Sequence, residues 1–141
     1  MSAAKLVVAA VIMRDNRILI CQRREDQGFA LQWEFPGGKV EPGEELTFAL
    51  HRELREELAI DARIGPWIAT VLHRYANGLA VELHFFRVDE FDGQIENKIF
   101  RQIRWVDRSE LDAKSFLEAD RQIVRQLKDE KEDLEGAASQ P

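Results

Sequence analysis

Three glutamates in one short stretch, Glu53, Glu56 and Glu57, are the side chains of this sequence best placed to do chemistry together. In an α-helix each residue turns the chain by about 100°, so this spacing puts all three carboxylates on one side. Like charges at such spacing destabilise a bare helix by roughly 0.2–0.5 kcal/mol per pair. A divalent cation turns that repulsion into a binding site, because Mg²⁺ and Mn²⁺ prefer oxygen ligands. The spacing therefore predicts a metal site, with a solvated acidic helix face as the alternative.

The segment before these acids has the features of a ligand-binding loop. It reads "EFPGGKVEPGE" over residues 34–44, and Gly37 and Gly38 allow the backbone to approach a ligand closely. The carbonyl of Gly37 is a candidate metal ligand, and Lys39 supplies a cation for a phosphate group. A solvated acidic helix would need no such loop, so the loop favours the metal site.

Two further residues are expected to organise the acidic cluster. Arg52 lies one helical turn before Glu56, so its guanidinium can pair with that carboxylate and hold the cluster in position. Glu44 is close to the expected start of the helix, where the helix dipole stabilises a negative charge. The other acids of this stretch, Glu41 and Glu45, are expected to be solvated.

The acidic cluster needs a helix to present it, and the sequence predicts one over residues 45–58. Leu46, Leu50, Leu54 and Leu58 recur every four residues and form an apolar stripe. This stripe is expected to anchor one side of the helix in the core while the acids face a cleft.

Alternating or continuous apolar runs predict β-strands on both sides of this helix. The runs cover residues 5–14, 17–24, 62–76, 79–91 and 99–107. Asp15-Asn16 and Asn77-Gly78 are turn signals that predict two hairpins. A second helix is predicted over 118–130. This order favours one α+β domain over residues 1–130, with a mixed sheet and helices packed against it, followed by a frayed tail over 131–141.

Composition narrows the class of protein. A net charge of −6 argues against stable nucleic-acid binding, which needs a basic surface that displaces counterions. The single cysteine, Cys21, leaves no partner for an intramolecular disulfide and fits a reducing compartment, so a cytoplasmic protein is expected. No apolar run approaches the roughly 18 residues of a membrane span. The apolar run near the N-terminus is interpreted as a buried first strand rather than a signal peptide.

The acidic stretch and the loop before it resemble the signature of the Nudix hydrolase family, over residues 4–130 of the chain. That signature sets a Gly, a Glu, an Arg-Glu pair and a Glu-Glu pair at fixed intervals. The matching residues here are Gly38, Glu44, Arg52, Glu53, Leu54, Glu56, Glu57, Leu58 and Ile60. Ala59 stands where the signature has a Gly that would tolerate positive φ after the helix. The resemblance implies a Nudix fold, a mixed β-sheet sandwiched between helices.

The family resemblance also implies a reaction. Water attacks a phosphorus atom of a nucleoside diphosphate linked to another group, assisted by bound Mg²⁺ or Mn²⁺. By resemblance, Glu53, Glu56 and Glu57 are metal ligands, joined by the carbonyl of Gly37 or Gly38. Glu53 is in addition a candidate general base.

One metal ligand of the MutT-type branch has no direct counterpart here. That branch often places a further metal-binding Glu shortly before the last core strand, where this chain has Ile99. Two alternatives remain open: Glu96 substitutes if its loop shifts, or Glu44 takes the role.

The segment "LQWEFPGGKVEPGE" resembles the MutT-type branch, whose members hydrolyse nucleoside triphosphates to monophosphate and pyrophosphate. By that resemblance Arg23 contacts phosphate and Asp120 reads the edge of the base. The alternatives are a solvated strand-end charge for Arg23 and a helix N-cap for Asp120. Phe35, Trp33 and Phe86 are candidates to stack on the base, although aromatics in a small domain more often belong to the core.

The leading hypothesis is therefore a Mg²⁺-dependent nucleoside triphosphate pyrophosphohydrolase that cleans the nucleotide pool, acting on oxidised dGTP or on cytidine nucleotides. The alternatives are a Nudix hydrolase of a dinucleoside polyphosphate or nucleotide sugar, and a non-catalytic nucleotide-binding module. The retained glutamates Glu53, Glu56 and Glu57 argue against the last. The expected partner is the nucleotide alone, with a monomer or homodimer and no membrane. His51, His73 and His84 are not spaced as a metal site.

Overall fold

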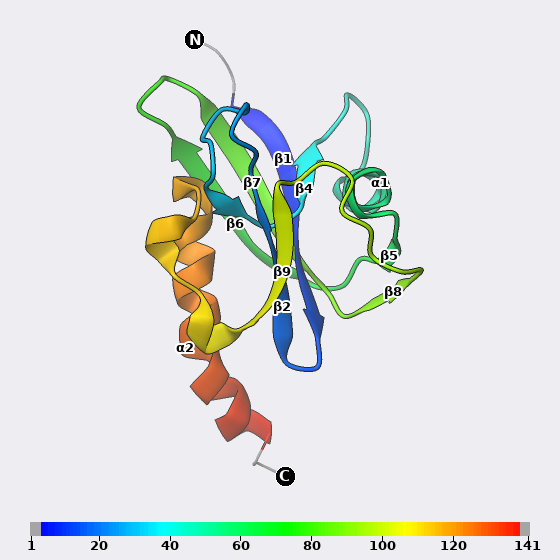
Figure 1. Cartoon of the computed structure of the whole chain (residues 1–141), viewed down its shortest axis with the longest axis vertical. Helices are drawn as coiled ribbons and strands as arrows, with labels where there is room; N and C mark the ends of the chain where they lie inside the picture. Colours follow the sequence, from blue (N-terminus) through cyan, green and yellow to red (C-terminus); the bar gives the residue numbers. More distant parts are fainter. Residues whose placement is uncertain (1–3, 139–141) are drawn as a thin grey trace.

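A mixed β-sheet forms the centre of the structure, with two helices on its opposite faces (Figure 1). The computed structural model describes the backbone of residues 4–138 and the side chains of residues 4–130. Its elements are β1 (Lys5–Arg14), β2 (Arg17–Gln22), β3 (Trp33–Glu34), β4 (Gly37–Lys39), α1 (Leu46–Leu58), β5 (Asp61–Arg63), β6 (Trp67–Arg74), β7 (Ala80–Val88), β8 (Glu90–Asp92), β9 (Gln102–Asp107), the 3₁₀ turns η1 (Arg108–Glu110), η2 (Ala113–Ser115) and η3 (Glu118–Asp120), and α2 (Arg121–Ala138). This arrangement confirms the predicted α+β class and the helix–sheet–helix sandwich.

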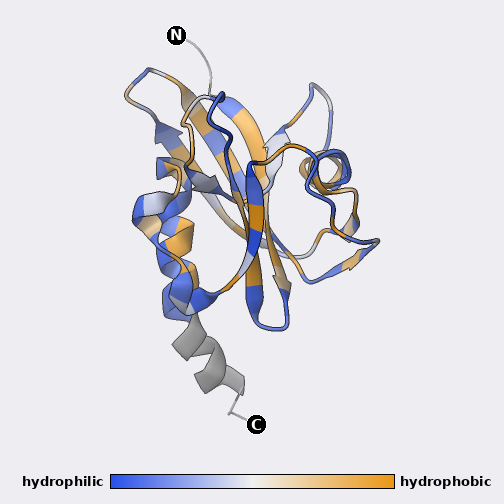
Figure 2. Cartoon of the chain, in the orientation of Figure 1, coloured by the Kyte–Doolittle hydropathy of each residue, from blue (hydrophilic) through white to orange (hydrophobic). Residues whose placement is uncertain are grey.

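Strand β1 serves both hydrophobic cores, because alternate residues of a strand face opposite sides of the sheet. The residues on one side are Val8, Ala10 and Ile12, which pack in the core of α1 with Leu50, Leu54 and Leu58. The residues on the other side are Ala9, Val11 and Met13, which pack in the core of α2 with Ile123, Val124 and Leu127. In Figure 2 hydrophobic residues gather along the central strands, while the turns that join them are mainly hydrophilic. The predicted leucine stripe thus anchors α1 to the sheet.

The glycine loop is fixed in place as a strand. Strand β4 pairs antiparallel with β1, with Ala9 opposite Gly37 and Val8 opposite Gly38. Strand β7 runs parallel to β1 on its other side. The backbone of the loop therefore lies directly beside the central strand and under α1.

Both predicted hairpins are confirmed. Strands β1 and β2 pair antiparallel through a turn in which Asp15 and Asn16 have φ of 53° and 63°. Strands β6 and β7 pair antiparallel, with Gly78 at a φ of 90° in the turn. The side chain of Asn77 accepts a hydrogen bond from the backbone N–H of Leu79 at 2.9 Å, which closes that turn. Short polar residues and Gly suit these positions because they tolerate positive φ.

The prediction of one strand over residues 62–76 is wrong. The chain forms β5 and then β6, which belong to different sheets, and β5 pairs with β8 in a separate two-stranded sheet. Pro66 separates them, because proline has no N–H to donate to a strand ladder. The strand predicted to start at residue 99 starts at Gln102.

The second helix differs from its prediction at both ends. It is preceded by η3 and runs past residue 130 to Ala138, where a frayed tail was expected to have begun already. Residues 139–141 of the predicted tail lie outside the described residues. Within the described chain, no helix is both long and apolar enough to cross a membrane.

Candidate active site

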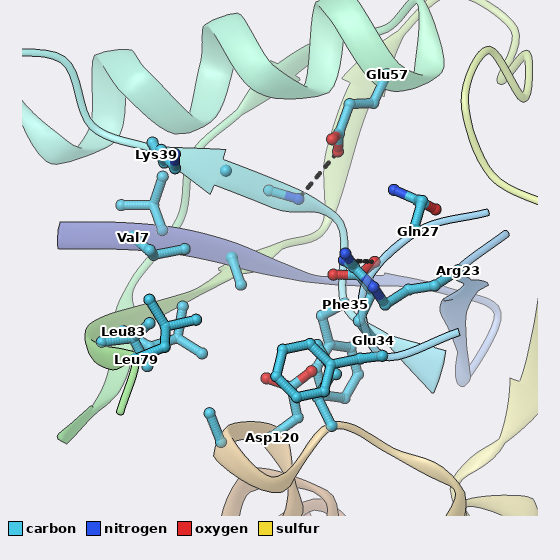
Figure 3. A pocket seen from close by; sticks show the side chains of 18 of the residues that line it. Val7, Arg23, Gln27, Glu34, Phe35, Lys39, Glu57, Leu79, Leu83 and Asp120 are labelled. Atoms are coloured by element: carbon cyan, nitrogen blue, oxygen red, sulfur yellow. Dashed lines mark hydrogen bonds and ion pairs between the residues drawn. The ribbon is translucent and has the colours of Figure 1, made fainter. Parts of the chain in front are cut away.

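A cavity of about 270 Å³ opens at the end of the sheet where β1 begins, between α1 and η3 (Figure 3). The predicted site residues that line it are Arg23, Phe35, Gly37, Gly38, Lys39, Glu57 and Asp120. In Figure 3, Glu57 descends from α1 at one end and Asp120 lies at the opposite end. Residues nearly a hundred positions apart in the chain are thus brought into one cavity.

At the first end, the carboxylates of α1 press against the glycines of β4. The Gly37 backbone N–H donates a hydrogen bond to Oε1 of Glu57 at 3.1 Å. A Cβ atom added to Gly38 would lie 2.5 Å from Oε2 of Glu53, and one added to Gly37 would overlap the backbone carbonyl of Val8. Gly38 is therefore required for Glu53 to approach the strand this closely, and Gly37 is required for β4 to lie against the backbone of β1.

Arg52 connects the parts of this acidic end. Its Nε and Nη2 donate to the two oxygens of Glu44 at 2.8 and 2.9 Å, and its Nη1 donates to Glu53 at 2.9 Å. Nη2 also donates to the carbonyl of Lys39 at 3.0 Å. The expected pairing with Glu56 is the weaker contact, at 3.4 Å. The planar guanidinium matches the two oxygens of Glu44, which explains why that carboxylate is the main partner.

The carboxylates of this end ionise very differently. Burial raises the pKa of Glu57 to about 9, and the neighbouring charges of Glu53 and Glu34 add to the effect. Burial also raises the pKa of Glu53, against the opposing effect of Arg52. The hydrogen bond from Arg52 lowers the pKa of Glu44 to about 2. Glu44 therefore stays ionised beside Arg52, whereas burial outweighs the charge of Arg52 at Glu53, and no neighbouring cation within the described part of the chain offsets burial at Glu57.

The donor groups at this end fit a hard divalent cation. Glu53, Glu57 and the exposed Glu56 provide carboxylate oxygens, and Gly37 adds a backbone carbonyl. The pKa values of Glu53 and Glu57 are raised. A bound dication would lower them, because it stabilises the ionised carboxylates. Among the side chains that the structure describes, no group of three His, Cys, Asp or Glu already has the arrangement of a metal site. Cation binding there competes with the hydrogen bonds from Arg52 and Gly37.

The region of the missing fourth carboxylate is apolar on the cavity side. Ile99 lines the cavity, whereas Glu96 is exposed and pairs with Lys98 at 3.3 Å. Glu96 could supply the ligand that the MutT-type branch has at the position of Ile99 only if its loop moved, so this role remains a prediction. Glu44, the other alternative, is fully engaged with Arg52.

At the opposite end of the cavity lies Asp120, which is only 3% exposed. Burial raises the pKa of Asp120 well above its ordinary value, and the charge of Glu34 raises it further. By contrast, the backbone N–H of Phe35 lowers the pKa of this carboxyl, because it favours the ionised form. The carboxyl is thus influenced by the strand region at Phe35, and its two possible roles, base recognition and helix N-cap, stay predictions.

Between the two ends lies an ion pair, one member of which sequence analysis did not identify. Nη1 of Arg23 donates to Oε2 of Glu34 at 3.0 Å, and Nε of Arg23 donates to the carbonyl of Gly28 at 2.7 Å. Burial raises the pKa of Glu34 despite this pairing. An available signal was the position of Glu34 between Trp33 and Phe35, an acid in an extended apolar segment.

The aromatic candidates are mainly core residues. Phe35 is 3% exposed and packs against Phe85 and Phe116, with ring centroids 6.1 and 5.3 Å away. Phe86 is buried in the core of α1, and the guanidinium of Arg104 lies over the ring of Trp33 at 5.3 Å. Of these candidates, only Phe35 also lines the cavity.

Three aromatic residues of the cavity wall were missed, which are Phe29, Tyr75 and Phe100. The rings of Phe29 and Tyr75 line the cavity and lie 4.7 Å apart. Phe29 comes from a loop and Tyr75 from the end of a hairpin strand, so no local pattern connects them.

The chain is similar to known proteins over most of its length. Residues 4–127 match the family model of the NUDIX domain. A CTP pyrophosphohydrolase of Escherichia coli is 42% identical over 104 residues, which cover 74% of this chain and 76% of that protein. An 8-oxo-dGTP diphosphatase of Haemophilus influenzae is 35% identical over 125 residues, covering 87% of this chain and 91% of that protein. The crystal structure of a MutT NUDIX hydrolase from Burkholderia pseudomallei superposes with a TM-score of 0.79 at 28% identity, over 89% of this chain and 98% of that one.

Proposed function

This chain belongs to the NUDIX family, and on that basis we propose that it hydrolyses nucleoside triphosphates to a monophosphate and pyrophosphate. It is a Nudix hydrolase of the MutT type, as its resemblance to the diphosphatases and pyrophosphohydrolases indicates. Enzymes of this family need a divalent metal, and we propose Mg²⁺ or Mn²⁺ because all the candidate donors are oxygens.

One observation carries the proposal. One cavity contains two different carboxyl groups at its two ends. Glu57 suits a metal–phosphate complex, and the buried Asp120 suits the edge of a base. A nucleotide has the same two chemically different ends. A solvated acidic helix face, which is the alternative, does not explain why these acids share a cavity with a buried carboxyl.

Each part of the cavity then has a task. The carboxylates of Glu53, Glu56 and Glu57 and the carbonyl of Gly37 would hold the cation. When bound, it would offset charge on the phosphate oxygens and lower the pKa of a coordinated water. Arg52 keeps Glu53 oriented, and Glu53 is the candidate to accept the proton of the attacking water.

Positive charge for the phosphates comes from two further side chains. Lys39 lies at the cavity edge beside the glycines, and Arg23 lies between the acidic end and Asp120. Contact between Arg23 and a phosphate would compete with its ion pair to Glu34. Gly37 and Gly38 also line the cavity, and a phosphate that accepted from the Gly37 N–H would compete with Glu57 for it.

The base is proposed to meet Asp120 and Glu34. A protonated carboxyl both donates and accepts a hydrogen bond, so it matches an edge with an acceptor nitrogen beside an amine, as in cytosine. An ionised carboxylate only accepts, so it matches the ring N–H and amine of a guanine. The relatives named for CTP and for 8-oxo-dGTP represent these two cases.

Further proposals concern the setting of the reaction. We propose a role in cleaning modified nucleotides from the pool, and the cytoplasm as its compartment, where Cys21 remains a free buried thiol. The nucleotide is the proposed partner, with no stable nucleic-acid binding and a monomeric or homodimeric state.

The test is pyrophosphate release from a panel of triphosphates with and without Mg²⁺. The panel contains 8-oxo-dGTP, dGTP, CTP, dCTP and 5-methyl-dCTP, with ADP-ribose as a substrate of a different type. Mg²⁺-dependent release from one or more triphosphates is expected, and the best substrate identifies the base. Hydrolysis of ADP-ribose alone would instead favour a Nudix hydrolase of another diphosphate derivative.

Two variants make this test specific. Glu57→Gln removes one proposed ligand and should lower kcat by about 10²-fold or more. Glu45→Gln changes an exposed acid at the start of the same helix, whose side chain makes no capping hydrogen bond, and should leave kcat unchanged. Full activity in Glu57→Gln would contradict the proposed site.

A further inference from the structure

The turn that carries Asp120 is a short segment with little support of its own. The 3₁₀ turn η3 spans Glu118–Asp120, and its backbone bonds include Asp120 N–H to the carbonyl of Leu117 at 2.9 Å. On one side it is attached to the β3 region, because the Leu117 N–H donates to the carbonyl of Trp33 at 3.0 Å. A 3₁₀ turn of this length depends on outside contacts for its position.

On its other side the turn is held by side chains from the end of β6. The buried hydroxyl of Tyr75 accepts a hydrogen bond from the backbone N–H of Ala119 at 3.3 Å. Nε2 of His73 lies 3.0 Å from Oε2 of Glu118. The rings of His73 and Tyr75 meet edge to face with centroids 4.6 Å apart, so the two contacts support each other. Glu118 and Ala119 of η3 are therefore held from outside, by His73 of β6 and by Tyr75 directly after it.

Of the residues that hold η3, Tyr75 lines the cavity, whereas His73 and Glu118 do not. The ring of Tyr75 lines the cavity, but its hydroxyl is used by Ala119. The described cavity wall does not include the side chains of His73 or Glu118. The His73–Glu118 pair can therefore influence a bound base only through the groups that it contacts, which are η3 and the ring of Tyr75.

We propose that Tyr75 and the His73–Glu118 pair are positioning residues that fix the depth of the Asp120 carboxyl in the cavity, and thereby set how sharply the enzyme discriminates between bases. The inference rests on the proposed role of Asp120 in base recognition. Discrimination by a hydrogen-bonding site is steep only when its groups are held in place, because a wrong base then leaves a buried polar group unpaired. A turn free to shift would accommodate several bases with similar affinity.

The test measures binding without catalysis. Dissociation constants of CMP, dGMP and 8-oxo-dGMP are measured by calorimetry without metal, and the ratio of the weakest to the tightest defines discrimination. Tyr75→Phe keeps the ring but leaves the buried Ala119 N–H without its partner, and should lower this ratio about tenfold. Glu118→Ala removes only the partly exposed pair and should lower it about threefold.

The control is a matched pair on the same sheet. Glu82→Ala breaks the contact of Glu82 with Nε2 of His84, which is 2.7 Å long and lies on β7 away from η3. The ratio of dissociation constants in Glu82→Ala should stay within a factor of about two of the wild-type ratio. Because binding is measured apart from turnover, a lack of hydrolysis would count against the proposed function and not against this inference.

Three results would overturn the inference in whole or in part. An unchanged ratio in Tyr75→Phe, with folding verified by circular dichroism, would overturn the role of Tyr75. An unchanged ratio in Glu118→Ala would remove the ion pair from the proposal. Equal affinity of the wild type for all three monophosphates would mean that there is no discrimination for η3 to set.

Discussion

At the scale of single residues, Glu57 has the most unusual chemistry of the site. Its carboxyl lies between α1, to which Glu57 belongs, and β4. Burial raises the pKa of this carboxyl to about 9 in the metal-free protein. Its one hydrogen bond, from the Gly37 N–H, favours the ionised form but does not outweigh burial and the nearby charges of Glu53 and Glu34. At neutral pH the metal-free carboxyl therefore holds a proton that a bound cation would have to displace.

This protonation predicts a dependence of stability on pH. In the unfolded chain a glutamate has a pKa of about 4.3, so between about pH 4.3 and 9 the folded state binds a proton that the unfolded state does not. The free energy of unfolding contributed by Glu57 must then fall as pH rises through this window. Urea denaturation in the presence of a chelator should show a steeper loss from about pH 6 to 9 in the wild type than in Glu57→Gln. Equal slopes would contradict the burial of a neutral carboxyl.

The two glycines of β4 predict contrasting results. In Gly38→Ala the new Cβ meets the end of the flexible Glu53 side chain, which can swing away, so stability should change little while kcat falls about tenfold or more. In Gly37→Ala the new Cβ meets the backbone of Val8, which cannot swing away as a side chain can. The free energy of unfolding should therefore fall by about 2 kcal/mol or more. Kinetics and urea denaturation of both variants provide the check. Similar stability losses in both would show that the strand, not Glu53, absorbs the change at Gly38.

At the scale of elements, α1 ends in a strained conformation. Ala59 has φ of 60° and ψ of 30°, and its N–H donates to the carbonyl of Arg55 in the manner of a left-handed helix cap. This is the backbone conformation that the Gly of the family signature would favour at this position. The strain lies just after Glu57 and next to the buried Ile60.

Ala59→Gly should therefore stabilise the protein. Relief of the left-handed strain exceeds the entropy that Gly adds to the unfolded chain, which gives a net gain of about 0.5–1 kcal/mol in the free energy of unfolding. Ala76→Gly is the matched control, since Ala76 is exposed and is not among the residues with positive φ, and it should give no gain. Urea denaturation measures both, and a loss of stability in Ala59→Gly would contradict the account of this cap.

The elements that sequence predicted correctly are those that local signals determine. The stripe of leucines fixes α1, and the Asp15-Asn16 and Asn77-Gly78 turns fix two hairpins, because each signal and its effect lie within a few residues. The break between β5 and β6 was missed because β5 finds its partner in β8, far along the chain. The Gly65-Pro66 pair was the local sign of that break.

At the scale of the whole molecule, the site is an assembly of distant segments. The glutamates and glycines of the acidic end lie in one continuous stretch, so their spacing sufficed to predict that they lie close together, while their role in metal binding stays a prediction. Glu34, Phe29 and Tyr75 were missed because they reach the cavity from three separate segments. Their meeting depends on how η3 and the hairpin β6–β7 pack across the sheet, which no local pattern encodes.

Cation binding should be visible in the stability of the whole protein. A ligand that binds only the folded state adds about 2.7 kcal/mol at a concentration of about 100 times its Kd. Mn²⁺ should therefore raise the Tm of the wild type and of Glu45→Gln, and raise it much less in Glu57→Gln. The shift should grow between about pH 6 and 9, because the cation competes with the proton on Glu57. Equal shifts in all three proteins would place the cation elsewhere.

The most direct test of the central claim is the identity of the products. The reaction of the best triphosphate is followed by ³¹P NMR in ¹⁸O-labelled water with Mg²⁺ present. The account predicts a nucleoside monophosphate and pyrophosphate, with one of them carrying the label, and no reaction when Mg²⁺ is chelated. Release of inorganic phosphate and a nucleoside diphosphate, or turnover that survives chelation, would contradict it.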